Sequence, residues 1–199
     1  MADWKSCTGA GLAALALTAG AHAVHARPVE IKAVPADGAA ALQGAAKVGV
    51  WAMTNGTAGP HVAARDRLPA KLSLEPGRYR LLVRYQGARR VIDRTLEAGD
   101  GPATWRIDLR AGHVRLELRP QPGQPPIAGE LGWKVRTYAR GKAAGKQVAE
   151  AAAARPRLLL DAGWYEVAVT NGGRTHEHVV QVRPGEDVVY SVIARDGGS

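Results

Sequence analysis

Hydrophobic and polar residues alternate along most of the chain with a period of two, the pattern of a β-strand that buries one face. The clearest run spans residues 78–86, where large apolar side chains fall on one side and arginines on the other. The same order returns at residues 164–171. Each run ends in residues typical of a hairpin turn, Gln86-Gly87 in the first and Asn171-Gly172-Gly173 in the second.

The alternating runs are short and are separated by turn residues, since the chain contains 24 Gly and 12 Pro. The expected strands are 29–34, 48–53, 71–74, 78–86, 89–97 and 104–109, followed by 113–119, 133–139, 156–160, 164–171, 174–183 and 187–194. Strands at this spacing, without helical periodicity between them, predict an all-β protein of two tandem small antiparallel β-sandwiches. The one exception is the alanine-rich stretch 147–154, which favours two turns of helix.

The two sets of strands align with each other, and Tyr79 then falls opposite Tyr165. We therefore predict a duplicated module, with one β-sandwich at residues 27–110 and the other at 113–199. The connection between the two is too short to act as a free linker. A fixed angle between the sandwiches, or a shared sheet, is expected.

An acidic residue, one further residue and then a glycine precede the tyrosine of each copy by a fixed spacing. The residues that carry this pattern are Gly77, Tyr79, Gly163 and Tyr165. The pattern resembles the tyrosine corner of immunoglobulin-like sandwiches, although the cysteine of true immunoglobulin domains is replaced by Leu81 and Val167. The form Pro-Gly-x-Tyr is also similar to strands of bacterial carboxypeptidase-regulatory-like and PEGA-type modules. That resemblance implies small extracytoplasmic sandwiches without chemistry of their own.

Residues 1–26 are predicted to be a signal peptide, because a basic start leads into an apolar core and small residues precede a cleavage site after Ala26. The apolar core is too short and too rich in alanine for a durable transmembrane anchor. The alternative is an alanine-rich soluble helix. Cys7 is the only cysteine and would leave with the signal peptide. We therefore expect no disulfide, thiolate metal site or thiol chemistry.

The chain is basic, with a formal net charge of +9, and arginines concentrate on the strands of the first repeat. The candidate residues for binding a polyanion are Arg78, Arg80 and Arg84 on one strand, with Arg90 and Arg94 on its partner. Arginine suits bidentate binding of phosphate or carboxylate, so an acidic glycan, a lipid phosphate or an acidic protein is the expected partner. The alternative is an ordinary solvated sheet face. Nucleic acid is not expected, since the chain lacks an aromatic stacking platform.

His176 and His178 fall on one face of an expected strand and are weak candidates for a metal site, the alternative being surface histidines. Trp164 is expected either to be exposed for a glycan or partner, or to cover a seam between the repeats. The sequence has no nucleophile elbow, phosphate loop or dinucleotide fingerprint, so we expect no enzyme and no cofactor.

These observations favour a non-enzymatic exported binding or scaffolding protein of the bacterial envelope, periplasmic or secreted and not transmembrane. Its partner would be a protein or an acidic glycan or lipid of that envelope, met at edge strands or at the basic strand face. One alternative is a periplasmic assembly chaperone with two sandwich domains and a basic cleft between them. The other alternative is a metal-binding accessory protein.

Overall fold

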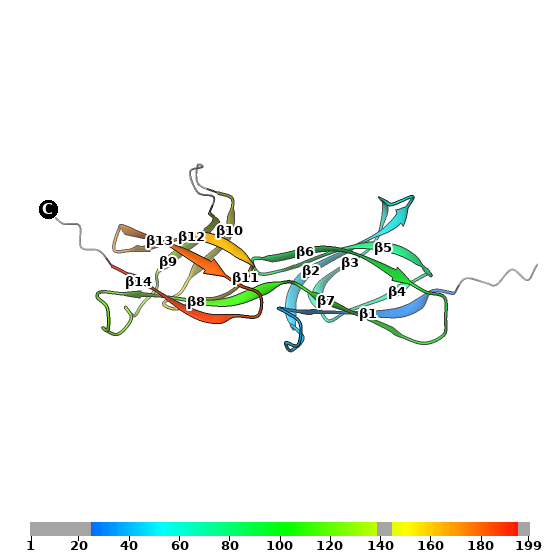
Figure 1. Cartoon of the computed structure of the whole chain (residues 1–199), viewed down its shortest axis with the longest axis horizontal. Helices are drawn as coiled ribbons and strands as arrows, with labels where there is room; N and C mark the ends of the chain where they lie inside the picture. Colours follow the sequence, from blue (N-terminus) through cyan, green and yellow to red (C-terminus); the bar gives the residue numbers. More distant parts are fainter. Residues whose placement is uncertain (1–24, 139–144, 195–199) are drawn as a thin grey trace, which may run out of the picture.

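The computed structural model describes residues 25–138 and 145–194, and every regular element in these ranges is a β-strand. The first unit contains β1 (Arg27–Val34), β2 (Gly44–Thr54), β3 (Thr57–Leu68), β4 (Ala70–Leu74), β5 (Gly77–Tyr85), β6 (Ala88–Leu96) and β7 (Ala103–Asp108). The second unit contains β8 (Ala111–Arg119), β9 (Gly132–Thr137), β10 (Gln147–Ala152), β11 (Arg157–Asp161), β12 (Gly163–Asn171), β13 (Arg174–Val182) and β14 (Asp187–Ile193). The all-β prediction is confirmed. The two units lie end to end (Figure 1).

The two units have the same strand order. In the first, a three-stranded sheet β4-β1-β7 faces a four-stranded sheet β3-β2-β5-β6. In the second, β11-β8-β14 faces β10-β9-β12-β13. Each three-stranded sheet contains one parallel pair, β1 with β7 and β8 with β14, while the remaining pairs are antiparallel. The alternation of residues within a strand does not show whether its neighbour runs parallel or antiparallel to it. The sequence therefore did not predict the two parallel pairs.

Each unit has seven strands, because β3 and β10 add to the six expected. The prediction of helical turns at residues 147–154 is wrong. Residues 147–152 form β10, which pairs with β9 and packs Val148, Ala149 and Ala151 against the second core. This pairing and burial override the helix propensity of alanine. The sequence pattern did not predict β3, because its side chains are nearly all exposed and show no alternation.

Each sandwich encloses its own hydrophobic core. Ile31, Leu81 and Ile107 are completely buried in the first, and Trp133 and Leu116 in the second. Burying each large aliphatic side chain contributes about 1.5–3 kcal/mol, so the two cores are a major source of stability for a fold that has no disulfide in the described ranges. The indole N–H of Trp133 donates to the carbonyl of Ala153 at 2.9 Å, which satisfies the one polar atom of that side chain.

Tyr79 in β5 and Tyr165 in β12 each bond back to the chain four residues upstream. The hydroxyl of Tyr79 donates to the carbonyl of Glu75 at 2.6 Å, and that of Tyr165 donates to the carbonyl of Asp161 at 2.8 Å. This is the hydrogen bond of a tyrosine corner. An acid, one residue and a glycine before each tyrosine is also a pattern typical of a turn whose glycine has a positive φ. That expectation is wrong here, because neither Gly77 nor Gly163 has a positive φ. A Cβ at either glycine would instead rest in ordinary contact with the tyrosine ring, at 3.7 Å and 3.8 Å.

The units are joined through β11. Leu158 and Leu160 of this strand lie in the second core, while Leu159 between them is fully buried in the core of the first unit. The β5–β6 hairpin holds Leu159 on both sides: Gly87 N–H donates to its carbonyl at 3.1 Å, and its own N–H donates to Gln86 Oε1 at 2.7 Å. These contacts fasten the hairpin of one sandwich to a strand of the other.

The expected signal peptide and Cys7 lie almost entirely outside the described residues, which begin at residue 25. Strand β1 begins at Arg27, the residue that follows the expected cleavage site. The Arg27 guanidinium donates to the carbonyls of Glu97 and Gly101, both at 3.0 Å. Across the described ranges, no helix is long and apolar enough to cross a membrane.

Candidate functional site

The outer face of the sheet β3-β2-β5-β6, turned away from the first core, carries the strongest concentration of unneutralised positive charge among the predicted sites. Inward residues such as Val48 and Val83 are buried, so their strand neighbours point outward. The register places the outward residues in three rows that cross β2, β5 and β6. The rows are Trp51–Arg80–Asp93, then Gly49–Leu82–Val91, then Lys47–Arg84–Arg89.

The third of these, which we call the basic row, places three cations side by side on neighbouring strands. Lys47 is directly opposite Arg84, which is directly opposite Arg89, and all three are exposed. Side chains opposite each other on a sheet have Cβ atoms about 4.5–5.5 Å apart, where like charges destabilise the pair. No side-chain ion pair neutralises this row within the described ranges. It is therefore a site where an anion would relieve repulsion.

The predicted arginines Arg78, Arg80 and Arg84 do share this outer face. Arg80, however, is already engaged: its Nε and Nη2 donate to the two carboxylate oxygens of Asp93 at 2.8 Å and 2.9 Å. These hydrogen bonds hold the pKa of Asp93 below its usual range and raise the pKa of Arg80. Arg78 lies opposite Thr95 at the far end of the face. Arg84 alone of the three belongs to the basic row.

Arg90 and Arg94 are not brought to the outer face. Arg90 is paired with Val83 and Arg94 with Tyr79, so both point to the side of the sheet that faces the core, at the edge of the sandwich. The Nε of Arg90 is buried and has no hydrogen-bond partner in the described part of the chain. Lys47 and Arg89 replace this pair in the site.

The second unit contains the same three positions without the charges. The residues that correspond to the basic row are Gly132, Thr170 and Thr175, since Thr170 pairs with both of the others in the same register. The two threonine hydroxyls are hydrogen-bonded to each other at 3.1 Å. The fold therefore forms this row from neutral residues as well, and it does not need three cations there.

A cleft of about 270 Å³ extends the basic row to the junction of the two units. Arg84 and Arg89 line it from the first unit, and Lys146 and Asp161 from the second. The Arg89 N–H donates to Asp161 Oδ1 at 2.9 Å. Burial raises the pKa of Asp161, although this hydrogen bond and the charges of Arg89 and Arg90 oppose the shift. We call this hollow the junction cleft.

His176 and His178 lie on the edge strand β13, opposite Val169 and Val167. No group of three or more His, Cys, Asp or Glu side chains in the described ranges is arranged to hold a metal ion. Two imidazoles on one strand leave a metal short of ligands, because structural sites use four and catalytic sites three.

Trp164 points to the outer side of the second four-stranded sheet, opposite Gln181. It is 50% exposed, so the first unit does not cover it as a seam residue. It lies on the unit whose sheet lacks the basic row, whereas Trp51 lies on the sheet that carries it.

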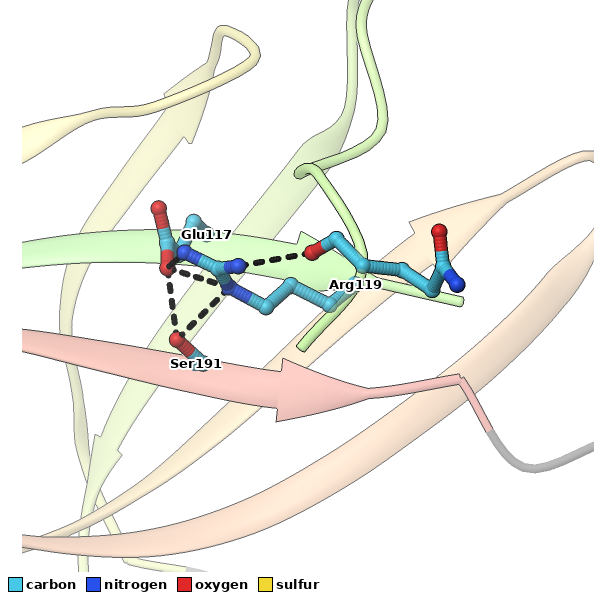
Figure 2. Close-up of polar contacts among 4 residues, drawn as sticks. Glu117, Arg119 and Ser191 are labelled. Atoms are coloured by element: carbon cyan, nitrogen blue, oxygen red, sulfur yellow. Dashed lines mark hydrogen bonds and ion pairs between the residues drawn. The ribbon is translucent and has the colours of Figure 1, made fainter. Parts of the chain in front are cut away.

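A buried carboxylate in the second unit was not anticipated from the sequence (Figure 2). Glu117 is 5% exposed and accepts hydrogen bonds from Ser191 at 2.6 Å and from Arg119 at 2.7 Å. Burial alone would raise the pKa of Glu117, but these hydrogen bonds and the arginine charges outweigh it, so the pKa is lowered. Arg119 also donates to the carbonyl of Gln124 at 2.6 Å and so holds down the loop that follows β8. The polar groups of Glu117, Arg119 and Ser191 bond to one another and to the loop, so this network has a structural role.

The comparisons with known proteins add little to this description. No protein-family model and no curated protein matches the chain. Among solved structures, the chain is similar to the Bacillus anthracis TIE protein at 15% identity and a TM-score of 0.33, covering 83% of this chain and 33% of that one. It is similar to a streptococcal ancillary pilin at 15% identity and a TM-score of 0.35, covering 87% of this chain and 63% of that one.

A minor pilin of Streptococcus agalactiae is similar at 11% identity and a TM-score of 0.38, covering 87% of this chain and 99% of that one. The chain thus spans one third of the first of these structures and less than two thirds of the second. Likenesses at this level of identity and TM-score carry no inference about activity, partners or location. Function is therefore argued from the chain's own residues.

Proposed function

We propose that the chain is a non-enzymatic, exported binding or scaffolding protein that contacts an acidic partner through the basic row of its first unit. One observation carries the proposal. Lys47, Arg84 and Arg89 stand together at positions where the duplicate unit has neutral residues. Since the fold does not require these charges and their mutual repulsion weakens it, their use is best explained by a ligand.

The chemistry of the site supports binding rather than catalysis. Asp93 at the outer face and Glu117 in the second unit are both held ionised by arginines, so neither is poised to transfer a proton near neutral pH. Asp161 in the junction cleft has a raised pKa, and its Oδ1 is occupied by the backbone N–H of Arg89. Exposed cations without such partners bind phosphate, sulfate or carboxylate groups. Export is proposed from residues 1–26, whose pattern is that of a signal peptide.

Retention on a heparin column tests the basic row. The variant Lys47→Thr, Arg84→Thr, Arg89→Thr gives the first unit the neutral character of the second and should elute at clearly lower salt. The matched control is Lys71→Thr, Arg115→Thr, Lys134→Thr, which removes the same charge from exposed positions elsewhere. If both variants elute together, net charge alone explains retention and the basic row is not a binding site.

The reciprocal variant asks whether the row is sufficient. Gly132→Lys, Thr170→Arg, Thr175→Arg builds the same row on the second unit, where a Cβ at Gly132 meets nothing closer than Thr170 at 3.9 Å. It should elute at higher salt than Ser73→Lys, Thr104→Arg, Gln121→Arg, in which the three added charges are scattered over exposed positions.

A second candidate function rests on the junction cleft. A periplasmic assembly chaperone needs a basic cleft between two sandwich domains, and Arg84, Arg89 and Lys146 supply one. Peptides with a free C-terminal carboxylate would then bind, while their amidated forms would not. Equal binding of both forms, or of neither, would remove this candidate.

A further inference from the structure

We propose that the outer face of the first unit binds an anionic polysaccharide, with a sugar ring stacked on Trp51 and the acid groups of the chain on the basic row. This inference rests on the proposed function and names the class of its partner. It comes from a feature that charge does not explain: an indole ring lies on the same sheet face as the cations.

Trp51 lies along the surface of the sheet. A Cβ built on Gly49 would come within 2.5 Å of the indole Cη2 and 2.8 Å of Cζ3, so the six-membered ring rests directly above the backbone of residue 49. Only glycine leaves room for this arrangement. His61, directly opposite Trp51 on β3, makes an edge-to-face contact with the indole, with ring centroids 5.1 Å apart and planes at 67°. Trp51 is thus fixed as a platform that remains partly exposed.

The row of residues between the row of Trp51 and the basic row is apolar. Gly49, Leu82 and Val91 form the middle row, and Val91 is 44% exposed. A shallow trough of about 560 Å³ runs over Gly49 and Leu82 beside Lys47. The indole lies over Gly49, two residues from Lys47 on the same strand, about 7 Å at the usual rise. The basic row crosses three neighbouring strands, about 10 Å at the usual strand spacing. The face therefore suits a ligand longer than one sugar ring.

The polar groups beside the platform match a sugar better than a peptide or a phosphate chain. Arg80 is directly opposite Trp51 and forms a planar, doubly hydrogen-bonded pair with Asp93. A pyranose ring presents a flat face of C–H groups to an aromatic ring and hydroxyl groups at its edge, which such a pair can donate to and accept from. A polyphosphate has no apolar face and would leave the indole and the middle row unused.

The charge pattern of the face gives the ligand a direction. Asp93 lies in the row of Trp51, so a carboxylate is present on that side. Asp66 lies on β3 beside Lys47, at the end of the basic row. The basic row has one cation on each of β2, β5 and β6. The acid groups of the ligand are therefore expected at the basic row and its neutral ring face at Trp51.

Binding of oligogalacturonate, measured by calorimetry on the full chain, tests the inference against polyglutamate as an acidic polymer without sugar rings. Trp51→Ala should weaken oligogalacturonate binding about tenfold and leave polyglutamate binding unchanged. Gly49→Val should act in the same way, because the added side chain displaces the indole without removing it. Trp164→Ala is the matched control, since it removes a half-exposed indole from the corresponding sheet of the second unit.

The outcomes separate this inference from the proposed function. If Trp51→Ala leaves oligogalacturonate binding unchanged while Lys47→Thr, Arg84→Thr, Arg89→Thr abolishes it, the basic row stands and the sugar platform is overturned. Equal losses for both polymers in Trp51→Ala would also overturn the platform. If neither polymer binds the unaltered protein, both proposals fail. Unchanged thermal unfolding of each variant shows that a loss is not due to misfolding.

Discussion

Replacing Leu159 with alanine should loosen the first unit, although residue 159 belongs to a strand of the second. Its side chain is completely buried in the core of the first unit, so the substitution opens a cavity there. Fully buried Leu→Ala substitutions cost about 2–5 kcal/mol, from lost transfer free energy and the unfilled cavity. The backbone bonds of Leu159 to Gln86 and Gly87 do not depend on its side chain, so the register of the junction should persist.

Hydrogen exchange measured by mass spectrometry resolves which unit is affected. Leu159→Ala should lower the opening free energy of amides in β5 and β6 by at least about 2 kcal/mol and affect the second unit less. Leu158→Ala is the control on the neighbouring residue, whose side chain lies in the second core, and its larger effect should fall on β12 and β13. Faster exchange confined to the second unit in Leu159→Ala would refute the assignment of this side chain to the first core.

Three further predictions concern the polar contacts. Tyr165→Phe removes the hydrogen bond to the carbonyl of Asp161 and should lower the free energy of unfolding by about 1 kcal/mol in urea titrations; the buried phenol itself should resist ionisation, with a pKa of about 12, in an ultraviolet pH titration. The pKa of Glu117 is lowered in the folded state, so its contribution is present above the unfolded value and is lost as pH falls through the folded value. Unfolding in urea should show a loss of stability below about pH 4 that is smaller in Glu117→Gln. The pKa of Asp161 is raised by burial, so Asp161→Asn should be at least as stable as the unaltered protein at pH 7, while Asp161→Ala should lose about 1 kcal/mol with the acceptor of Arg89. A less stable Asn variant would contradict this.

The fold was largely predictable because its strands bury one face. Residues 78–86 and 164–171 alternate cleanly, and they became β5 and β12, the central strands of their sheets. Strand β3 has almost no buried side chain, so no period of two marks it. Strand β10 is rich in alanine, which favours a helix locally, and its pairing with β9 makes it a strand.

The site was only partly predictable, and for different reasons. The turn at Gln86-Gly87 fixes the register of its hairpin, so Arg89 could have been placed beside Arg84, and Arg90 on the opposite face, by counting alone. Lys47 could not be placed, because nothing local shows that β2 is the other neighbour of β5. Leu159 stands in a run of three leucines, and the sequence does not say that the middle one belongs to the other unit.

The hairpin that joins the two units is also the hairpin that carries the binding residues. Gln86 and Gly87 are bonded to Leu159, and the N–H of Arg89 is bonded to Asp161, so the backbone beneath Arg84 and Arg89 is held from both sandwiches. A ligand at the basic row then meets a backbone that needs little further ordering, which reduces the entropic cost of binding.

The corresponding hairpin of the second unit neither joins the two units nor carries the binding residues. Its turn is formed by Gly172 and Gly173, which both have positive φ, as a tight hairpin requires. The residues beside that turn are the hydrogen-bonded pair Thr170 and Thr175 rather than two arginines. In the first unit, Gln86 stands at a turn position with a φ of 50°, a left-handed conformation that a non-glycine residue adopts at some cost. Its side chain accepts the hydrogen bond from Leu159 that glycine could not. The hairpin of the second unit is therefore an ordinary turn. In the first unit, Gln86 makes the turn less favourable but bonds the hairpin to the second unit, and the same hairpin presents Arg84 and Arg89.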